Sequence, residues 1–366
     1  MRLSSIITTF ESDFLAQYQG RLLPSHRQAL AAMKGCRSQL GPKIQAACDS
    51  CHHQILVPHS CGHRNCPHCQ SHESQQWIER QLKKQLPADY FLLTFTLPAE
   101  LRSLAWRHQR AIYALMTRCS WETVCAFSQN DRQLQGIPGA TTVLHTHSRR
   151  LDYHPHIHMV VPAAAINAAK RLWRAKKGKG KRRYLFNHKA LAKVFRAKLL
   201  EAISRAGLSL PETPPKDWVV DCKAVGSGEK VLVYLGRYLY RGVIQEKDIV
   251  ACENGQVSFR YRDGKSKQWE YRTVPGAKFL WLIVQHVLPK GFRRARNYGF
   301  LHPNSKRLIQ LIQYLLNREP KCKKAWMRAR PKLICRCCGA AMKIIRTRIY
   351  PELGYKIKAG GSPLAV

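Results

Sequence analysis

Two pairs of cysteines near the N-terminus have the spacing of metal ligands. Cys48 and Cys51 form the first pair, Cys66 and Cys69 form the second, and fourteen residues separate the two pairs. Thiolates at this local spacing can share one ion, and the intervening loop lets both pairs complete a tetrahedron. A closed site of four thiolates stabilises a small domain and leaves no open position for catalysis. The spacing therefore predicts one structural Zn²⁺ held by these four cysteines.

Further cysteines and histidines could extend this chemistry. Four of them lie close to the two pairs: Cys36, His59, Cys61 and His63. They could be alternative or additional ligands, but we expect surface or packing roles for them. Near the C-terminus, the run Cys335-Arg-Cys-Cys338 contains a single Cys-X-X-Cys pair. Two interpretations of this run stay open: half of a second zinc site, completed by Cys322 and Cys337, or a set of free thiols.

The segment His156-Ile157-His158 carries two imidazoles two positions apart on a predicted strand. Side chains at this spacing point to one face of a strand, while Ile157 points to the other face and the core. His145 lies eleven residues upstream of His156, which suits a partner on the preceding antiparallel strand. Three imidazoles would then converge, which favours a metal site. The alternative interpretation is that this histidine-rich hairpin is a polar surface.

Tyr234 and Tyr238 lie four residues apart in the segment VLVYLGRYLYR. We expect a helix over residues 229–241, and a spacing of four places both phenols on one face of that helix. Tyrosines so spaced are more often packing residues than catalysts. Arg237 and Arg241 lie beside them and are candidate phosphate-contacting residues, because they would present positive charge on the same helix.

Short strands and helices must position these motifs. Runs rich in β-branched and aromatic residues begin at Tyr90, Ala140 and His154, and a helical stretch from Glu100 to about Phe127 separates the first run from the second. This order predicts an α+β fold with a central antiparallel sheet and packed helices. We expect three regions: a zinc-binding module over residues 1–85, the sheet domain over 86–305, and a basic region with a possible second zinc knuckle over 306–366.

The charge balance favours a polyanionic partner. The chain has 62 Lys and Arg against 22 Asp and Glu, a formal net charge of +40. No amphipathic membrane anchor accompanies this charge, so nucleic acid is the favoured partner. The segment 170–183, KRLWRAKKGKGKRR, is too charged for a core and is predicted to be a basic loop. Its candidate nucleic-acid-binding residues are Lys176, Lys177, Arg182 and Arg183, and a merely solvated surface run is the alternative.

Several motifs together resemble the two-tyrosine HUH transposases of the insertion-sequence-91 family. In the order of the chain they are FLLTFTLP, HTHSRRLDYHPHIHMVVP, WVVDCKAV, VLVYLGRYLYRGVI and HVLPKGFRRARNYGFL. The N-terminal segment CDSCHHQILVPHSCGHRNCPHC is similar to that family's zinc-binding domain, which implies that the module over residues 1–85 recognises DNA. The resemblance covers most of the chain and implies an HUH endonuclease domain, named after the His-hydrophobe-His motif, that acts in a rolling-circle type of transposition.

The resemblance also implies a chemistry for the site. His156 and His158 would bind a divalent metal, Mg²⁺ or Mn²⁺, and Tyr234 and Tyr238 would be nucleophiles that form a covalent 5′-phosphotyrosine with single-stranded or hairpin element ends. Similarity to the three-histidine arrangement of conjugative relaxases makes His145 the third ligand, ahead of Asp152. The alternatives are a rolling-circle replication initiator or conjugative relaxase with the same chemistry, and a non-catalytic, zinc-dependent DNA-binding regulator.

The N-terminal sequence lacks the basic start and long apolar run of a signal peptide. The most apolar later stretches, 90–97 and 279–288, are shorter than the roughly 18 residues that a membrane span requires. Many of the 14 cysteines cluster in close pairs, which favours metal ligation over disulfides. We therefore expect a soluble cytoplasmic protein with no membrane partner, associated with the nucleoid of a bacterial cell.

Overall fold

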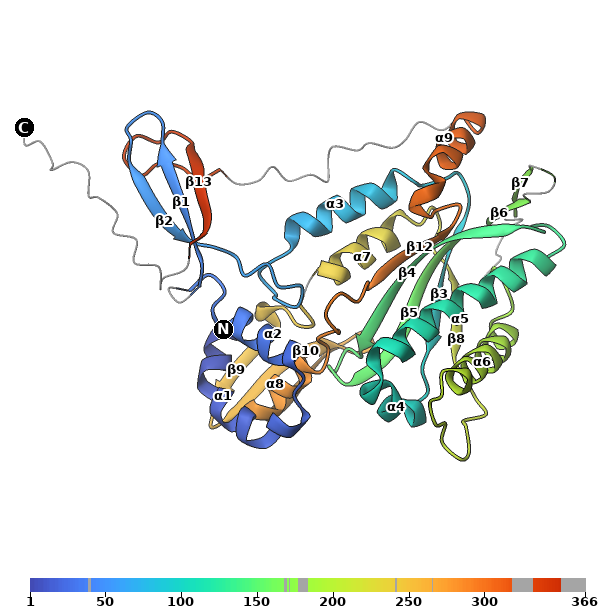
Figure 1. Cartoon of the computed structure of the whole chain (residues 1–366), viewed down its shortest axis with the longest axis horizontal. Helices are drawn as coiled ribbons and strands as arrows, with labels where there is room; N and C mark the ends of the chain where they lie inside the picture. Colours follow the sequence, from blue (N-terminus) through green and yellow to red (C-terminus); the bar gives the residue numbers. More distant parts are fainter. Residues whose placement is uncertain are drawn as a thin grey trace, which may run out of the picture.

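A large antiparallel sheet forms the centre of the molecule (Figure 1). The computed structural model describes residues 1–38, 41–167, 170, 172–176, 184–240, 242–264, 266–317 and 332–349. The sheet runs in the order β7-β6-β4-β5-β3-β8, and β12 also pairs with β4. Its strands are β3 (Tyr90–Thr96), β4 (Ile137–His147), β5 (Tyr153–Pro162), β6 (Ala164–Asn167), β7 (Leu172–Ala175), β8 (Val220–Ala224) and β12 (Ala295–Gly299). The prediction of an α+β fold with a central antiparallel sheet is confirmed.

Helices cover both faces of this sheet. One face packs against α4 (Arg102–Arg107), α5 (Gln109–Asn130) and α6 (His188–Arg205), and the other against α3 (Ser71–Leu82) and α7 (Glu229–Tyr240). Strand alternation separates the two cores: Leu144 and Ile157 face α5 and α6, whereas Val143 and Val160 face α7. His145 and His158 lie two positions from Val143 and Val160, so they share the α7 face with these valines. His156 lies one position from Ile157, so it is on the α7 face as well.

Two elements of the structure differ in detail from the elements expected from the sequence. The single helix expected over residues 100–127 is divided at His108, whose φ of −123° and ψ of 46° interrupt the helix between α4 and α5. The segment expected as a basic loop over residues 170–183 begins with a strand, because β7 pairs with β6 in antiparallel register. Periodicity could not reveal this strand, since its partner and not its own composition stabilises it.

The N-terminal helices pack with residues from the second half of the chain. α1 (Leu3–Tyr18) and α2 (Pro24–Lys34) bury apolar side chains against α8 (Gly276–Val284) and against a separate sheet of β9 (Ile249–Glu253), β10 (Gln256–Arg262) and β11 (Trp269–Pro275). Tyr18 stacks on Trp281 with a ring-centroid distance of 4.9 Å. α3 belongs instead to the α7 core. The described residues of the range 1–85 therefore contribute to several hydrophobic clusters and do not share one core of their own.

A small third sheet joins segments from both ends of the described chain. β1 (Lys43–Cys48) pairs with β2 (Gln54–Pro58) on one side and with β13 (Met342–Ile349) on the other. α9 (Lys306–Leu315), which precedes β13 in the chain, packs Ile309 and Ile312 against Leu86 and Phe300. Among the described helices, none combines the length and apolarity needed to cross a membrane.

Candidate active site and cysteine clusters

Three histidines meet on the α7 face of the central sheet. In the pairing of β4 with β5, His145 lies directly opposite His156, and Val143 lies opposite His158. His156 and His158 share a face because strand side chains alternate with a period of two. One ring nitrogen from each of the three histidines lies within 4.8 Å of the others. The expected position of His145 opposite the pair is confirmed, and these three residues are called the histidine cluster below.

Burial keeps the histidine cluster neutral. Loss of solvation lowers the pKa of His156 to about 4 and that of His158 to about 3, and it holds the pKa of His145 well below its ordinary value. Neighbouring imidazoles lower the pKa of His145 further, because they disfavour a second positive charge. Each ring therefore retains a lone pair at pH 7, which is the form that binds a metal ion.

Hydrogen bonding also suits ligation by this cluster. Nδ1 of His156 donates to the backbone oxygen of His154 at 2.7 Å, which leaves Nε2 with the lone pair. Within the described structure, the buried Nε2 of His145 and Nδ1 of His158 have no hydrogen-bond partner. A buried nitrogen without a partner is costly unless another group satisfies it, so these rings fit a cation. Asp152 lies outside the cluster and pairs with Arg272 at 2.8 Å.

α7 presents both tyrosines to the histidine cluster. Tyr238 stacks on His145 with ring centroids 3.4 Å apart and ring planes 8° from parallel, and the Tyr234 centroid is 6.5 Å from the same imidazole. The two phenols differ in access: Tyr234 is 51% exposed, whereas the Tyr238 hydroxyl is buried without a hydrogen-bond partner in the described structure. Burial raises the pKa of both, which keeps them protonated at pH 7.

Gly236 brings α7 close to α3. Ser74 of α3 donates a hydrogen bond from its hydroxyl to the Gly236 oxygen at 2.9 Å. A Cβ at Gly236 would lie 2.9 Å from Cε3 of Trp77, and closer still to Ile78. The absence of a side chain here lets α7 pack closely against α3 on the same face of the sheet, with Tyr238 against His145.

Arg294 closes the site beside Tyr238. Its guanidinium carbon is 4.7 Å from the centroid of the Tyr238 ring. Nε donates to the Leu144 oxygen at 3.1 Å, and Nη1 donates to the Leu239 oxygen at 3.3 Å. Arg294 thus ties the end of α7 to β4 and holds a fixed positive charge at the phenol. No signal in the sequence separates Arg294 from the neighbouring arginines, because its contacts join three segments that are distant in the chain.

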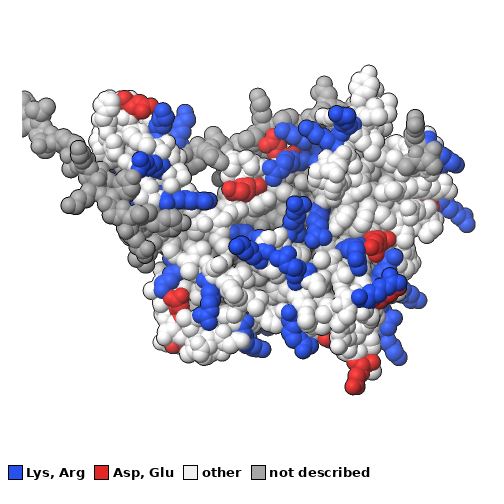
Figure 2. Space-filling view, viewed as in Figure 1, with Lys and Arg blue, Asp and Glu red and all other residues white. Residues whose placement is uncertain are grey.

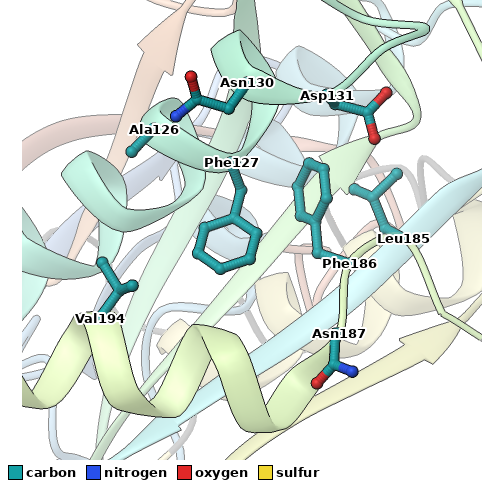
Figure 3. A pocket seen from close by; sticks show the side chains of 8 residues that line it. All are labelled: Ala126, Phe127, Asn130, Asp131, Leu185, Phe186, Asn187 and Val194. Carbon is teal, nitrogen blue, oxygen red and sulfur yellow. The ribbon is translucent and has the colours of Figure 1, made fainter.

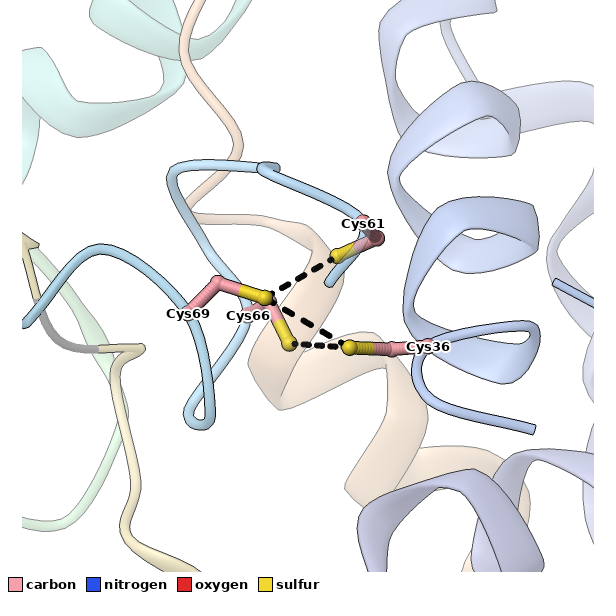
Figure 4. Close-up of side chains that lie close together, drawn as sticks. All are labelled: Cys36, Cys61, Cys66 and Cys69. Atoms are coloured by element: carbon pink, nitrogen blue, oxygen red, sulfur yellow. Dashed lines mark hydrogen bonds between the residues drawn. The ribbon is translucent and has the colours of Figure 1, made fainter. Parts of the chain in front are cut away.

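The cysteines form two clusters, and the expected grouping of Cys48, Cys51, Cys66 and Cys69 around one ion is wrong. Cys66 and Cys69 meet Cys36 and Cys61, as Figure 4 shows. The Sγ atom of Cys36 is 3.5 Å from the Sγ atoms of both Cys66 and Cys69, and the Sγ atom of Cys61 is 3.6 Å from that of Cys69. Sulfurs in a tetrahedral zinc site are about 3.8 Å apart, given Zn–S bonds of about 2.3 Å. Cys36 and Cys61, for which we expect surface or packing roles from the sequence, thus complete a group of four sulfurs that could share one ion.

Cys48 and Cys51 belong to the second cluster, with Cys335 and Cys338. The physical reason is the pairing of β1 with β13, which carries the C-terminal cysteines to the end of the β1–β2 hairpin. Cys337 is exposed and lies outside this cluster, and Cys322 lies outside the described residues. The interpretation of the C-terminal pair as half of a metal-type site fits this arrangement, but its partners are Cys48 and Cys51.

The chain is similar to transposases over most of its length. Residues 6–97 match the family described as "Transposase zinc-binding domain", and residues 139–308 match the family described as "Putative transposase". A Sinorhizobium fredii protein described as "Putative transposase y4qJ" is 31% identical over 323 residues, which cover 82% of this chain and 80% of the relative. The chain belongs to the insertion-sequence-91 family of transposases. The resemblance inferred from the motifs is confirmed.

Another relative is a Pseudomonas savastanoi pv. phaseolicola protein described as "Transposase for insertion sequence element IS801". It is 28% identical over 274 residues, covering 69% of this chain and 64% of the relative. Among solved structures, conjugative relaxase TrwC with a 27-mer DNA gives a TM-score of 0.26 at 15% identity, over 63% of this chain and 74% of that chain. The metal-bound TrwC complex with oriT DNA gives 0.27 at 14%, over 63% and 73%. The family assignment rests on the sequence relatives.

Positive charge lies over the face of the transposase that carries α7. Figure 2 shows Lys and Arg side chains gathered near the centre of the view, in the region where Figure 1 places α7 and β12. Arg237 is exposed on α7. Lys176 forms an ion pair with Asp131 and donates to the Leu185 oxygen, so its charge is partly neutralised. The other candidate DNA-binding residues, Lys177, Arg182, Arg183 and Arg241, lie outside the described residues.

A pocket of about 450 Å³ lies between the end of α5 and the start of α6 (Figure 3). Phe127 and Phe186 line it together with Asn130 and Asn187. This pocket belongs to the face of the sheet opposite the histidine cluster, because α5 and α6 pack on that face. None of its lining residues belongs to the histidine cluster or to α7, so the candidate active site is elsewhere.

Proposed function

We propose that this transposase nicks and rejoins single-stranded DNA at the ends of its element, with tyrosines of α7 as nucleophiles and a divalent metal ion at the histidine cluster. The observation that carries the proposal is the stack of Tyr238 on His145, with centroids 3.4 Å apart, next to two further imidazoles. Membership of a transposase family supports DNA as the substrate. The formal charge of +40 supports a polyanion as well.

The histidine cluster supports the metal part of the proposal. His145, His156 and His158 would hold the ion, and their depressed pKa values leave all three neutral at pH 7. The resemblance implies Mg²⁺ or Mn²⁺, and neutral imidazoles favour Mn²⁺ of the two, since Mg²⁺ prefers oxygen ligands. When bound, the ion would act as a Lewis acid that stabilises charge on the phosphate oxygens.

The tyrosine performs the covalent step. Its phenolic oxygen forms a bond to phosphorus and loses its proton to solvent, while the bond from phosphorus to the leaving 3′ oxygen breaks. The leaving oxygen takes up a proton and becomes a 3′ hydroxyl, and the 5′ phosphate stays esterified to tyrosine. Because the phosphotyrosine ester conserves the energy of the broken phosphodiester bond, attack by a 3′ hydroxyl on this ester can rejoin DNA without ATP.

We assign the first cut to Tyr234 and the second to Tyr238. Tyr234 is 51% exposed, so it is the more accessible of the two phenols to a DNA strand. The Tyr238 hydroxyl is buried, with Arg294 over the ring and His145 beneath it. Tyr238 would become reachable only after a change in this stack. Two nucleophiles on one helix let one strand stay covalently bound while another is cut.

The surrounding residues have supporting roles in this proposal. Arg294 would offer its fixed charge to phosphate beside Tyr238, and the exposed Arg237 would contact the backbone of the bound strand. Membership of the zinc-binding transposase domain family supports a structural Zn²⁺ near the N-terminus. We assign that ion to the cluster of Cys36, Cys61, Cys66 and Cys69, because all four sulfurs lie within 4.8 Å of one another and so are close enough to share one ion.

The test is formation of a covalent DNA adduct. Labelled single-stranded oligonucleotides that tile both ends of the element are incubated with the full chain and Mn²⁺, and adducts are separated in denaturant. We expect a denaturant-resistant adduct that the double variant Tyr234→Phe with Tyr238→Phe abolishes. Tyr240→Phe, on the same helix, is the matched control and should keep the adduct.

His156→Ala with His158→Ala tests the metal in the same assay. We expect this variant to lose both the adduct and the binding of Mn²⁺ measured by calorimetry. The proposal is wrong if no oligonucleotide yields an adduct, or if the double tyrosine variant forms it at the normal rate.

A further inference from the structure

We propose that Cys48, Cys51, Cys335 and Cys338 bind a second structural zinc ion, which joins the two ends of the described chain into one zinc ribbon. This site goes beyond the nuclease function and beyond the zinc-binding domain match, which covers residues 6–97 only. Cys48 and Cys338 are separated by 290 positions in the sequence. The ion would therefore make residues near the C-terminus an integral part of the N-terminal cysteine region.

The positions of the sulfurs fit zinc and exclude disulfides. Sγ of Cys48 is 3.4 Å from Sγ of Cys338, and Sγ of Cys51 is 3.5 Å from Sγ of Cys335. All four sulfurs lie within 4.8 Å of one another. A disulfide requires about 2.05 Å between sulfurs, whereas a tetrahedral Zn²⁺ with bonds of about 2.3 Å places sulfurs about 3.8 Å apart.

The two Cys-X-X-Cys turns have the same backbone geometry, which is an independent observation. In the first turn, the His52 amide donates to the Cys48 oxygen at 3.0 Å, and the Cys48 amide donates to the His53 oxygen at 2.9 Å. The residue after the second cysteine, His52, has a positive φ of 57°. These hydrogen bonds fold the turn so that the Sγ atoms of Cys48 and Cys51 lie within 4.8 Å of each other.

The second turn repeats each of these features. The Gly339 amide donates to the Cys335 oxygen at 3.0 Å, and the Cys335 amide donates to the Ala340 oxygen at 2.8 Å. Gly339 follows the second cysteine and has a φ of 72°. Two segments unrelated in position thus adopt the same ligand-presenting turn and face each other, which a shared ion explains and unrelated surface loops do not.

Packing alone offers little to hold this sheet together. The buried apolar cluster around it consists of Ala46, Cys48, Cys335 and Met342. On β13, Ile344 is 51% exposed and Ile345 is 50% exposed, so the strand buries little of its own apolar surface. Small domains with so few buried side chains depend on disulfides or metals for stability. A zinc–thiolate site supplies the missing free energy, since metal binding and folding are coupled.

Zinc content tests the proposal directly. Native mass spectrometry of the full chain should show one zinc fewer in Cys335→Ser with Cys338→Ser than in the wild type. Cys337→Ser is the matched control, because Cys337 lies in the same turn but outside the cluster, and it should retain the wild-type zinc content. Equal zinc content in the wild type and the double variant overturns the proposal.

Alkylation of the wild type provides a test that needs no variant. Cys51, Cys337 and Cys338 are all exposed, so exposure alone predicts that iodoacetamide modifies them at similar rates. Zinc ligation predicts that Cys337 reacts at least tenfold faster than the other two, and that a chelator removes the difference. Similar rates for all three before chelation also overturn the proposal. Neither measurement involves DNA cleavage, so failure here leaves the nuclease proposal to its own test.

Discussion

Replacement of Gly236 by alanine tests whether the close approach of α3 and α7 positions the tyrosines. In an isolated helix, alanine is favoured over glycine by about 1 kcal/mol. Here the new Cβ would lie 2.9 Å from Trp77 and closer to Ile78, both of which are buried, so α7 must move by roughly 1 Å to reach ordinary contact. Overpacking of this kind costs about 1–3 kcal/mol. We therefore expect Gly236→Ala to lower the free energy of unfolding by about 0–2 kcal/mol.

The effect on chemistry should exceed the effect on stability. A displacement of roughly 1 Å at a reacting group can cost about 100-fold in rate, so adduct formation should fall by about 10- to 100-fold. Urea unfolding and the rate of adduct formation with Mn²⁺ measure the two effects. Gly20→Ala is the matched control, because a Cβ there has no atom within 4 Å. A Gly236→Ala protein that is more stable than the wild type and forms adducts at the normal rate would refute the positioning role of this contact.

Two further predictions concern residues around the site and the N-terminal core. Arg294→Lys should lower the free energy of unfolding by about 1–3 kcal/mol, because lysine keeps the charge but loses the hydrogen bonds to the Leu144 and Leu239 oxygens. An unchanged urea unfolding curve would contradict this prediction. Burial lowers the pKa of His26 from 6.5 to about 4. Between pH 6.5 and pH 4, the unfolded chain therefore binds a proton at this residue that the folded chain does not bind. The free energy of unfolding falls as the pH drops through this window. His26→Gln should therefore lose about 1 kcal/mol less stability than the wild type between pH 7.5 and 5.5, and equal losses would contradict the burial of a neutral imidazole.

The histidine cluster shows how far sequence reasoning reaches. The strand period places His156 and His158 on one face, and hairpin register places His145 opposite them; both follow from local geometry. The stack of Tyr238 on His145 does not follow from local geometry, because it depends on where α7 packs. Helix spacing alone favours a packing role for both tyrosines, and the family resemblance is what made them candidates.

The cysteine clusters show where sequence reasoning stops. Local spacing identified the Cys-X-X-Cys pairs but contains no information about which pairs meet in space. Cys48 and Cys51 meet Cys335 and Cys338 because β13 pairs with β1 across nearly the whole chain. Cys36 follows the end of α2 and has no partner at Cys-X-X-Cys spacing, so its place beside Cys66 and Cys69 depends on the packing of α2.

The central claim is that a tyrosine of α7 becomes covalently joined to a DNA 5′ end. Protease digestion of the purified adduct, followed by mass spectrometry of the nucleotide-bearing peptide, identifies the modified residue. We expect a phosphodiester on Tyr234 after the first cut, with a free 3′ hydroxyl on the released strand. A nucleotide attached to any residue outside α7, or a cut that leaves a free 5′ phosphate and no adduct, would contradict it.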